Sequence, residues 1–196
     1  MDLTHLIYLH GFRSSPASAK AQRMAAWAAM QPGLTFVCPQ LPPSPADAMA
    51  LVATLVAGWP AQGAAVVGSS LGGFYATALA EQPAHHGWRA AVLNPAVHPA
   101  RDLAGHIGEL SAWHDETLKF DFTAQHVAEL VALAPPARLT NPGRYYALIA
   151  KGDELLDWQE MHARYAGCAG EVIDGSDHGL TDFDNHLPAL LGHLTR

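Results

Sequence analysis

Gly68-Ser69-Ser70-Leu71-Gly72 is the stretch that decides the fold, because it fits the pattern G-x-S-x-G between a strand signal and a helix signal. The apolar run Ala64–Val67 before it predicts a buried strand, and the alanine-rich run Gly73–Gln82 after it predicts a helix. A serine at such a junction is held with its hydroxyl exposed at the end of the sheet. We expect glycine on both sides of it, because strand and helix come too close there for side chains. The stretch therefore predicts a nucleophilic Ser70.

Length and composition predict one compact domain spanning residues 1–196. A chain of this length can bury roughly 70% of its unfolded surface in a single core. Hydrophobic residues make up 49% of the chain and charged residues 15%, which argues against disorder. The formal net charge of −7 argues against a nucleic-acid partner. No apolar run has the length of a membrane span, so we expect no membrane partner.

Two further features predict a cytoplasmic protein. The N-terminal segment 1–11 has no basic region and leads directly into a predicted strand, so we expect no secretory signal. Cys38 and Cys168 are too few for a disulfide framework, and reduced thiols are the simpler interpretation.

Strand and helix patterns alternate along the chain. The predicted strands are His5–Leu9, Thr35–Cys38, Ala64–Val67, Arg89–Leu93, Tyr145–Ala150 and Glu171–Ile173. The predicted helices outside the long connection at 98–143 are Ala17–Met30 (with Ser15 as its N-cap), Ala46–Gly58, Gly73–Gln82 and Asp184–Leu194. Repeated strand–helix units indicate an α/β fold, with about six mainly parallel strands and helices on both faces. In such sheets, active sites gather at the carboxyl ends of the strands.

One segment interrupts the alternation. Residues 98–143 are longer than an ordinary connection between two strands. The pattern at Thr123–Ala134 predicts a helix with Thr123 as its N-cap, and Asp102–Leu118 is a candidate for another helix. We interpret the insertion at about 98–143 as a small helical lid over the strand ends. The alternative is a stabilising addition away from the reactive site.

Two further residues complete a predicted catalytic triad. The compact α/β-hydrolase fold places its nucleophile, acid and histidine in that order along the chain. Asp153 follows the fifth predicted strand, and His178 follows the sixth on a glycine-containing loop. A serine hydroxyl needs a base to remove its proton, and the base needs an acid to fix its tautomer. We therefore predict Ser70 as nucleophile, His178 as base and Asp153 as acid.

Three other acidic residues lie near these positions. Glu154 and Asp157 are alternatives to Asp153, which we favour because it stands at the strand terminus. Asp177 is adjacent to His178, and adjacent side chains in an extended loop point apart.

The tetrahedral oxyanion needs two hydrogen-bond donors. One is expected to be the backbone N–H of Leu71, the residue after the nucleophile, and the other an N–H from the loop after the first strand. In that loop we select Phe12, which follows His10 and Gly11. Loss of one such donor typically costs about 2.7–4 kcal/mol of transition-state stabilisation.

The motifs also resemble those of a known family. They are Tyr8-Leu9-His10-Gly11-Phe12, Ser14-Ser15-Pro16, Gly68-Ser69-Ser70-Leu71-Gly72-Gly73, Asn94-Pro95-Ala96, Gly152-Asp153-Glu154-Leu155-Leu156-Asp157 and Asp177-His178. As an ordered set they resemble the small bacterial YqiA-like esterases of the α/β-hydrolase superfamily. The resemblance implies a minimal hydrolase core, a short helical cap, no cofactor and ester hydrolysis by Ser70, Asp153 and His178. The sequence departs from the family at Arg13, where asparagine is usual, and at Leu180, where an aromatic residue is usual. Both departures bear on substrate preference.

Substrate contacts are indicated less directly. His10 and Gly11 leave the first strand beside the predicted oxyanion loop and are candidate substrate-binding residues. Trp113, Phe120 and Phe122 in the insertion either line an acyl pocket or anchor the insertion to the core. No zinc motif and no phosphate-loop lysine is present, so we predict no metal and no cofactor.

The leading prediction is a serine hydrolase that cleaves carboxylic esters of short to medium acyl chain through an acyl-enzyme. Thioester hydrolysis on acyl-CoA or an acyl carrier is the alternative, because triad and oxyanion hole serve both leaving groups. A small-molecule ester or thioester is therefore the expected partner. The hypothesis from a different class is a non-catalytic binding protein with the same fold. A fluorophosphonate probe separates the two classes, because it labels only an activated serine.

Overall fold

The computed structural model describes residues 2–113 and 115–196. Its main sheet has six strands in the order β2-β1-β3-β4-β7-β8, and every neighbouring pair is parallel. The strands of this sheet are β1 (His5–Leu9), β2 (Thr35–Val37), β3 (Ala64–Ser69), β4 (Arg89–Leu93), β7 (Tyr145–Ala150) and β8 (Ala169–Ile173). The predicted α/β fold with a six-stranded parallel sheet is confirmed.

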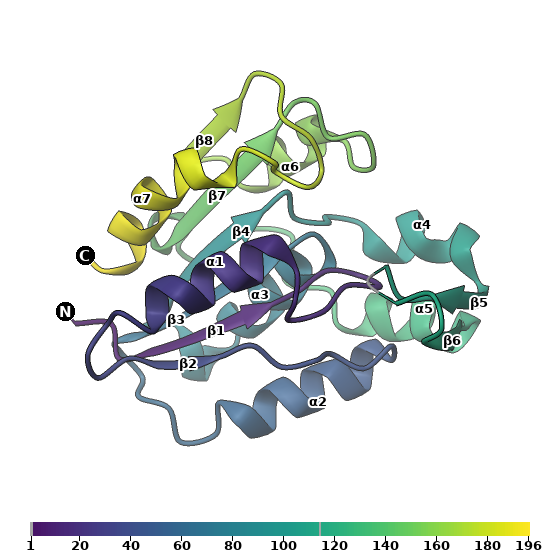
Figure 1. Cartoon of the computed structure of the whole chain (residues 1–196), viewed down its shortest axis with the longest axis horizontal. Coiled ribbons are helices and arrows are strands. Elements are labelled where there is room, and N and C mark those ends of the chain that lie inside the picture. The colour runs from purple at the N-terminus through teal and green to yellow at the C-terminus, as the bar shows by residue number, and fades with distance from the viewer. Residues whose placement is uncertain (1, 114) are drawn as a thin grey trace.

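Helices cover both faces of this sheet. They are α1 (Ala19–Ala28), α2 (Pro45–Leu55), α3 (Leu71–Ala80), α6 (Trp158–Arg164) and α7 (Phe183–Leu194). Residues of α1 and α7 pack in one buried cluster, and residues of α2, α3 and α6 pack in the other. In Figure 1, α1 lies in front of the sheet and α3 behind it. The short helix α6 has no counterpart among the predicted helices.

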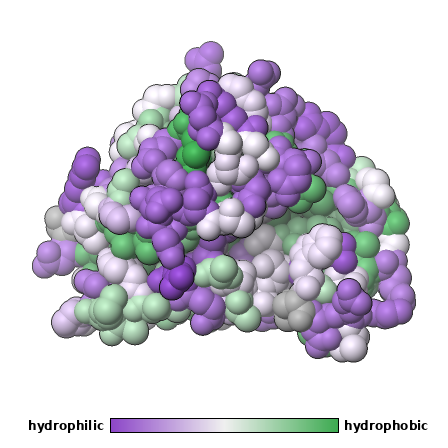
Figure 2. Space-filling view, turned by 45° about the horizontal axis from the view of Figure 1, so that its top comes forward, coloured by the Kyte–Doolittle hydropathy of each residue, from purple (hydrophilic) through white to green (hydrophobic). Residues whose placement is uncertain are grey.

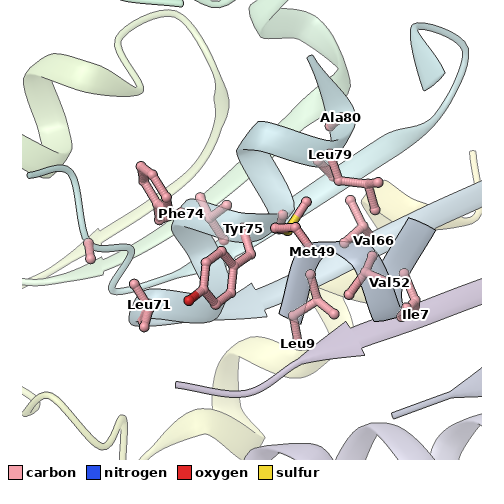
Figure 3. Packing of buried hydrophobic residues seen from close by; sticks show 14 of the residues in the cluster. Ile7, Leu9, Met49, Val52, Val66, Leu71, Phe74, Tyr75, Leu79 and Ala80 are labelled. Carbon is pink, nitrogen blue, oxygen red and sulfur yellow. The ribbon is translucent and has the colours of Figure 1, made fainter. Parts of the chain in front are cut away.

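Strand β1 illustrates why both faces are buried. Successive side chains of a strand point to opposite faces, so Ile7 and Leu9 join one cluster while Leu6 and Tyr8 join the other. All four are fully buried. Figure 3 shows Ile7 and Leu9 in the same cluster as Met49 of α2. A strand that is apolar on both faces is typical of a parallel sheet covered on both sides.

The junction between β3 and α3 requires glycine, as the sequence predicts. A methyl group on Gly68 would overlap the carbonyl group of Gly72, and one on Gly72 would overlap the carbonyl group of Leu9. Helix and strands are therefore in backbone contact at this point.

The insertion at 98–143 is only partly helical. Its elements are α4 (Pro99–Leu103), the 3-10 turn Ala104–His106, β5 (Gly108–Ser111), β6 (Lys119–Phe122) and α5 (Ala124–Ala132). Thr123 caps α5 as predicted, because its hydroxyl accepts a hydrogen bond from the His126 N–H. The helix suggested for Asp102–Leu118 is present only at the start of that range, where α4 and the 3-10 turn reach His106; beyond it β5 pairs antiparallel with β6 in a small hairpin. In β6, Phe120 and Phe122 alternate with the exposed Lys119 and Asp121, which is the strand period of two.

The prediction that Ser15 caps the first helix is also wrong. Helix α1 begins at Ala19, with Ser18 in the N-cap position. The Ser15 hydroxyl accepts a hydrogen bond from the Ala17 N–H (3.2 Å), and the Ser18 N–H donates to the Ser15 carbonyl (3.1 Å). These bonds form a separate turn before the helix, and they place Ser18 where it faces the site described below.

No helix within the described residues combines the length and the apolar character needed to cross a membrane. Cys38 and Cys168 are free thiols, and burial raises the pKa of each to about 11. Neither is therefore a thiolate at neutral pH.

Candidate active site

Ser70 occupies the strained turn between β3 and α3. Its backbone has φ 56° and ψ −121°, in the left-handed half of φ space that residues with a Cβ rarely adopt. Three backbone hydrogen bonds hold it there: its N–H donates to Leu93, and its carbonyl accepts from Gly73 and Ala96 (2.9, 2.9 and 3.0 Å). This geometry holds the Ser70 side chain at the carboxyl end of the sheet.

His178 links Ser70 to Asp153. Its Nε2 lies 3.1 Å from Ser70 Oγ, and its Nδ1 lies 2.8 Å from Asp153 Oδ2. The Asp153 side chain is 0% exposed, and the His178 side chain is 19% exposed. The structure thus brings together the three residues of the predicted triad, which lie after β3, β7 and β8.

The second oxygen of Asp153 explains the orientation of the first. Asp153 Oδ1 accepts hydrogen bonds from the N–H groups of Leu155 (2.9 Å) and Leu156 (2.8 Å). Its Oδ2 is therefore directed at His178, which donates through Nδ1–H. That tautomer leaves Nε2 as an acceptor for the Ser70 hydroxyl proton.

The competing acids have other partners. Glu154 Oε2 accepts from the backbone N–H of His178 (3.0 Å) and so holds the loop rather than the ring. Asp157 caps α6 by accepting from the Gln159 N–H (2.8 Å). Asp177 accepts from the Thr181 N–H (3.0 Å). Asp153 is thus the one of these four whose carboxylate meets the imidazole of His178 in the described residues.

Asn94 is a positioning residue whose role is not predicted from the sequence. Its Nδ2 donates to the carbonyls of Asp177 (3.0 Å) and His178 (3.3 Å), and its Oδ1 accepts from the Ala150 N–H (2.8 Å). The side chain is fully buried and joins the end of β7 to the His178 loop. Its place directly after β4, at a strand end like the other site residues, is the signal that could have indicated it.

Backbone strain is concentrated around the site. The non-glycine residues with positive φ in the described chain are Arg13, Ser70, Asn94, Ser176 and Leu180. They lie in the loops that follow β1, β3, β4 and β8. Such conformations cost about 1–3 kcal/mol each and persist where the surrounding contacts impose them, which is often at functional sites.

The predicted oxyanion loop lies against Ser70. A methyl group on Gly11 would come within 3.1 Å of Ser70 Cβ, so the loop after β1 passes directly over the serine. Within the described residues, neither the Phe12 nor the Leu71 amide donates a hydrogen bond. Both N–H groups are therefore free to bind an oxyanion.

His10 supports this loop. It is buried, and its two ring nitrogens contact the Gly11 carbonyl (2.9 Å) and the Leu41 N–H (3.0 Å). Since the Leu41 amide must donate, Nε2 is the acceptor and Nδ1 carries the proton. His10 thereby ties the loop after β1 to the segment after β2.

Two cavities meet at the segment Gly11–Ser14, which lines both. The cleft of about 460 Å³ contains Ser70 and His178. A second cavity of about 570 Å³ lies across the segment and contains neither residue. It is lined mainly by apolar side chains, among them Leu41, Pro42, Pro43, Leu51, Tyr75 and Phe120. We take the smaller cleft as the reactive site, because it holds the serine and the histidine.

The insertion forms part of the Ser70 cleft. Its contributions to the lining are Asp102, Leu103, His106 and Trp113. Figure 2 shows a mostly hydrophilic face with hydrophobic side chains around a hollow on the right, the side on which the insertion lies in Figure 1.

The three aromatic residues of the insertion have different positions. Trp113 lines the Ser70 cleft, whereas Phe120 lines the second cavity. Phe122 is buried and lines neither cavity; its ring packs 5.1 Å from that of Phe12 and anchors the insertion to the core. Arg13 fastens the hairpin, since its guanidinium stacks 3.9 Å from the Trp113 ring and donates to the Ser111 carbonyl (2.6 Å).

A metal site requires several ligating side chains that lie close together. Within residues 2–113 and 115–196, no group of three or more His, Cys, Asp or Glu side chains is placed to hold a metal ion.

A parallel sheet with this strand order and a serine in a strained turn after β3 defines the α/β-hydrolase class of fold. Residues 5–195 match the model of the family described as "Uncharacterised protein family (UPF0227)", and the chain belongs to that family. This is the YqiA-like family, so the resemblance stated from the sequence motifs is confirmed.

Solved structures with the same fold are distant in sequence. A protein of Agrobacterium vitis S4 has a TM-score of 0.76 at 17% identity, covering 97% of this chain and 87% of its own. The metagenome-derived lipolytic enzymes LipS and LipT supply a structure with a TM-score of 0.71 at 17% identity, covering 98% and 94%. Mouse alpha/beta hydrolase domain-containing protein 10 has a TM-score of 0.70 at 16% identity, covering 97% and 90%. At these identities the similarity establishes the fold.

Proposed function

We propose that this chain is a serine hydrolase that cleaves carboxylic esters of short to medium acyl chain. The observation that carries the proposal is the hydrogen-bonded series Asp153–His178–Ser70, with distances of 2.8 and 3.1 Å, inside a cleft large enough for a small molecule. Proteins with the same fold include one described as a carboxylesterase of Bacillus subtilis and one described as a monoacylglycerol lipase of Paleococcus ferrophilus. Ester hydrolysis is therefore the reaction class that we favour.

The first half of the reaction forms the acyl-enzyme. Ser70 Oγ attacks the carbonyl carbon of the ester while His178 Nε2 takes the hydroxyl proton. The carbonyl oxygen becomes an oxyanion and is bound by the N–H groups of Phe12 and Leu71. The tetrahedral intermediate collapses as the C–O bond to the alcohol breaks, and His178 gives its proton to the leaving oxygen.

The second half releases the acid. A water molecule loses a proton to His178 Nε2 and attacks the acyl carbon, and the oxyanion is again bound by the two amides. Collapse breaks the bond to Ser70 Oγ, which recovers the proton from His178. Asp153 remains ionised throughout and stabilises the imidazolium in both halves.

We further propose that residues 1–196 act as one domain, with the insertion at 98–143 as a lid over the cleft. The contribution of Trp113 and Leu103 to the cleft lining supports this role over that of a remote stabilising addition. The clamp of Arg13 on Ser111 and Trp113 holds the insertion against the oxyanion loop.

Covalent labelling tests the proposal. Wild-type protein should react with a fluorophosphonate probe and hydrolyse short-chain 4-nitrophenyl esters. Ser70→Ala and His178→Ala should each remove hydrolysis almost completely, with little further loss in the double variant, because triad members act as a unit. Ser69→Ala is the matched control and should keep the label.

Near-normal turnover in a folded Ser70→Ala protein would contradict the assignment. Absence of both label and turnover in wild-type protein would favour the non-catalytic binding protein. Faster turnover of acyl-CoA than of the matching oxygen esters would favour the thioesterase alternative.

A further inference from the structure

One side of the Ser70 cleft is built from the end of β1 and the start of α1. Tyr8, Ser18 and Lys20 line the same cleft as Ser70 and His178. Tyr8 belongs to the buried cluster that also contains Ala21 of α1, so strand and helix meet directly behind this surface. We call Tyr8, Ser18 and Lys20 the α1 wall.

Lys20 brings an incompletely paired ammonium group to the α1 wall. Its Nζ donates one hydrogen bond, to the carbonyl of Gly179. No carboxylate of the described residues lies within 4.0 Å of it, so two of its three protons have no protein acceptor. Burial lowers the pKa of Lys20 to about 8, although the charges of Asp177 and Asp153 act in the opposite direction. An anion in the cleft would replace the solvation that this ammonium has lost.

Tyr8 and Ser18 add two unused hydroxyl groups. Tyr8 is fully buried, and its hydroxyl has no hydrogen-bond partner in the described residues; its contact with the Ser69 side chain falls outside ordinary hydrogen-bond geometry. Ser18 is the N-cap of α1, yet its side chain makes no capping hydrogen bond. A buried donor without a partner is costly, which indicates that a ligand or solvent group satisfies it.

The N-terminus of α1 adds a partial positive charge to this side of the cleft. The first turn of α1 has no acidic residue, so the positive end of its dipole is not neutralised by a side chain. Amide groups at such a terminus favour anions.

The other charged groups of the cleft already have partners. Asp102 is paired with Arg101 (2.7 Å), and the Arg13 guanidinium is bound to Ser111 and stacked on Trp113. His178 is bound to Asp153. His106 contributes an edge-on contact to Phe12. Lys20 is therefore the lining residue best placed to bind a new anion.

We propose that the α1 wall binds an anionic group, a carboxylate or a phosphonate-like oxyanion, that the substrate carries together with its scissile ester. This inference rests on the proposed function, because it places the anion relative to an ester at Ser70. The protein would accordingly prefer anionic esters to neutral esters of the same shape. A merely structural Lys20, which only holds the Gly179 carbonyl, would create no such preference.

Matched methyl esters test the proposal. Monomethyl glutarate carries a carboxylate, methyl 4-phosphonobutanoate carries a phosphonate, and methyl 5-methylhexanoate has a neutral isopropyl group at the same place. The quantity to measure is the ratio of kcat/KM for each anionic ester to kcat/KM for the neutral ester, by titration of the acid released at pH 7. Ser70→Ala supplies the background rate. We expect the wild-type ratios to exceed one, and comparison of the two anions identifies which the wall favours.

Three variants isolate Lys20. Lys20→Met keeps the length of the side chain and should lower the ratio about tenfold to a hundredfold, the loss of one charge-assisted hydrogen bond. Lys20→Arg should retain most of the ratio. Arg23→Met removes the same charge from the exposed side of α1, where Arg23 pairs with Asp184, and should leave the ratio unchanged. The neutral ester reports any general damage from losing the Gly179 contact.

The pH dependence gives a second measure that needs no destabilising change. Lys20 binds anions only when protonated, so the wild-type ratio for monomethyl glutarate should fall as the pH rises through about 8. In Lys20→Arg the ratio should stay level over the same range, because guanidinium keeps its proton.

Two results would overturn the inference: wild-type ratios of anionic to neutral kcat/KM of one or less, and ratios that do not change in Lys20→Met. Both leave the proposed function intact, provided that cleavage of the neutral ester depends on Ser70. If Lys20→Met does not fold, a pH-independent wild-type ratio would overturn the inference equally. Failure to cleave any ester, together with absence of fluorophosphonate labelling, would instead contradict the proposed function itself.

Discussion

The carboxylate of Asp153 is oriented by residues next to it in the sequence, and it binds His178, which is distant in the sequence. Two amides from its own loop hold Oδ1, and only Oδ2 is left for His178. Because those two hydrogen bonds restrict rotation of the carboxylate, the imidazole receives a defined partner and a defined tautomer. Glu154 contributes differently, since it binds the His178 backbone.

The difference between these neighbours leads to a prediction at the residue scale. Asp153→Asn should lower turnover of a short-chain ester by several powers of ten, because the amide favours the wrong imidazole tautomer. Glu154→Gln and Asp157→Asn, the matched changes nearby, should have much milder effects. Steady-state kinetics with folded variants checks this. If Asp157→Asn is inactive while Asp153→Asn remains active, the acid of the triad is Asp157, at the start of α6, and the assignment of Asp153 is wrong.

At the scale of elements, a buried ion pair joins the end of α3 to the start of β7. Arg144 Nη2 and Glu81 Oε1 are 2.7 Å apart, with side chains 6% and 1% exposed. The Tyr145 hydroxyl and the Thr140 N–H also donate to the Glu81 carboxylate (2.5 and 3.0 Å), and Arg144 donates to the Ala80 carbonyl (2.6 Å). The bond to Ala80 satisfies a carbonyl at the C-terminus of α3, and the bonds to Glu81 hold the same end of the helix, opposite Ser70.

Glu81→Gln should destabilise the fold by roughly 3–5 kcal/mol, because it leaves the Arg144 guanidinium buried without its counter-charge. Urea unfolding with an unchanged m-value is the measurement. Glu160→Gln is the matched control: Glu160 also faces an arginine at 2.7 Å, but that pair is exposed to water and salt, so its loss should be much smaller. Equal losses would show that burial does not set the strength of the Glu81 pair.

The contribution of the Glu81–Arg144 pair to the stability of the fold depends on pH, and the pKa of Glu81 gives the direction. Burial tends to raise the pKa of Glu81, but the hydrogen bonds from Tyr145 and Thr140 and the charge of Arg144 outweigh it and hold the pKa below its ordinary value. A carboxylate with a lowered folded-state pKa stabilises the fold above its unfolded pKa, and this contribution is lost as the pH falls through the folded-state value. The stability difference between wild-type protein and Glu81→Gln should therefore narrow in acid.

At the scale of the whole molecule, the parallel sheet assembles the site. The loops after β1, β3, β4, β7 and β8 leave the same edge of the sheet, because all its strands run in one direction. They bring Phe12, Ser70, Asn94, Asp153 and His178 to that edge. Residues of the insertion line one side of the cleft, and residues at the start of α1 line another.

The volume of the Ser70 cleft predicts a limit on the length of the acyl chain. The Ser70 cleft measures about 460 Å³, and a longer acyl chain would have to pass the segment Gly11–Ser14 to reach the second cavity. Each methylene adds about 0.8 kcal/mol only while it is buried. Across 4-nitrophenyl esters of increasing acyl length, kcat/KM should be highest for short to medium chains and decline for long ones.

Leu51→Trp sharpens that test, because Leu51 lines only the second of the two cavities. We expect it to leave the chain-length profile unchanged. A steady rise in kcat/KM to long chains that Leu51→Trp abolishes would place the acyl chain in the second cavity and contradict the size limit.

The sequence by itself determined the α/β fold, the six strands, the glycines beside Ser70 and the order of the three predicted site residues. These depend on local patterns: apolar runs, helical spacing, and the close backbone contact at the turn between strand and helix. The cap at Thr123 is equally local, since donor and acceptor are three residues apart.

Only the tertiary structure decided the remaining features, because they depend on contacts between segments far apart in the chain. The hairpin β5–β6 forms where a helix had some local support, since its aromatic residues pack on Phe12. The choice of Asp153 over Glu154 depends on the position of the His178 ring, and the role of Asn94 depends on a loop more than eighty residues away. Lys20 has an ordinary sequence context and gains significance only because folding places its partly buried side chain in the cleft that contains Ser70 and His178. Local patterns specify elements, whereas the distances between side chains on different elements are fixed only when the sheet and its helices pack together.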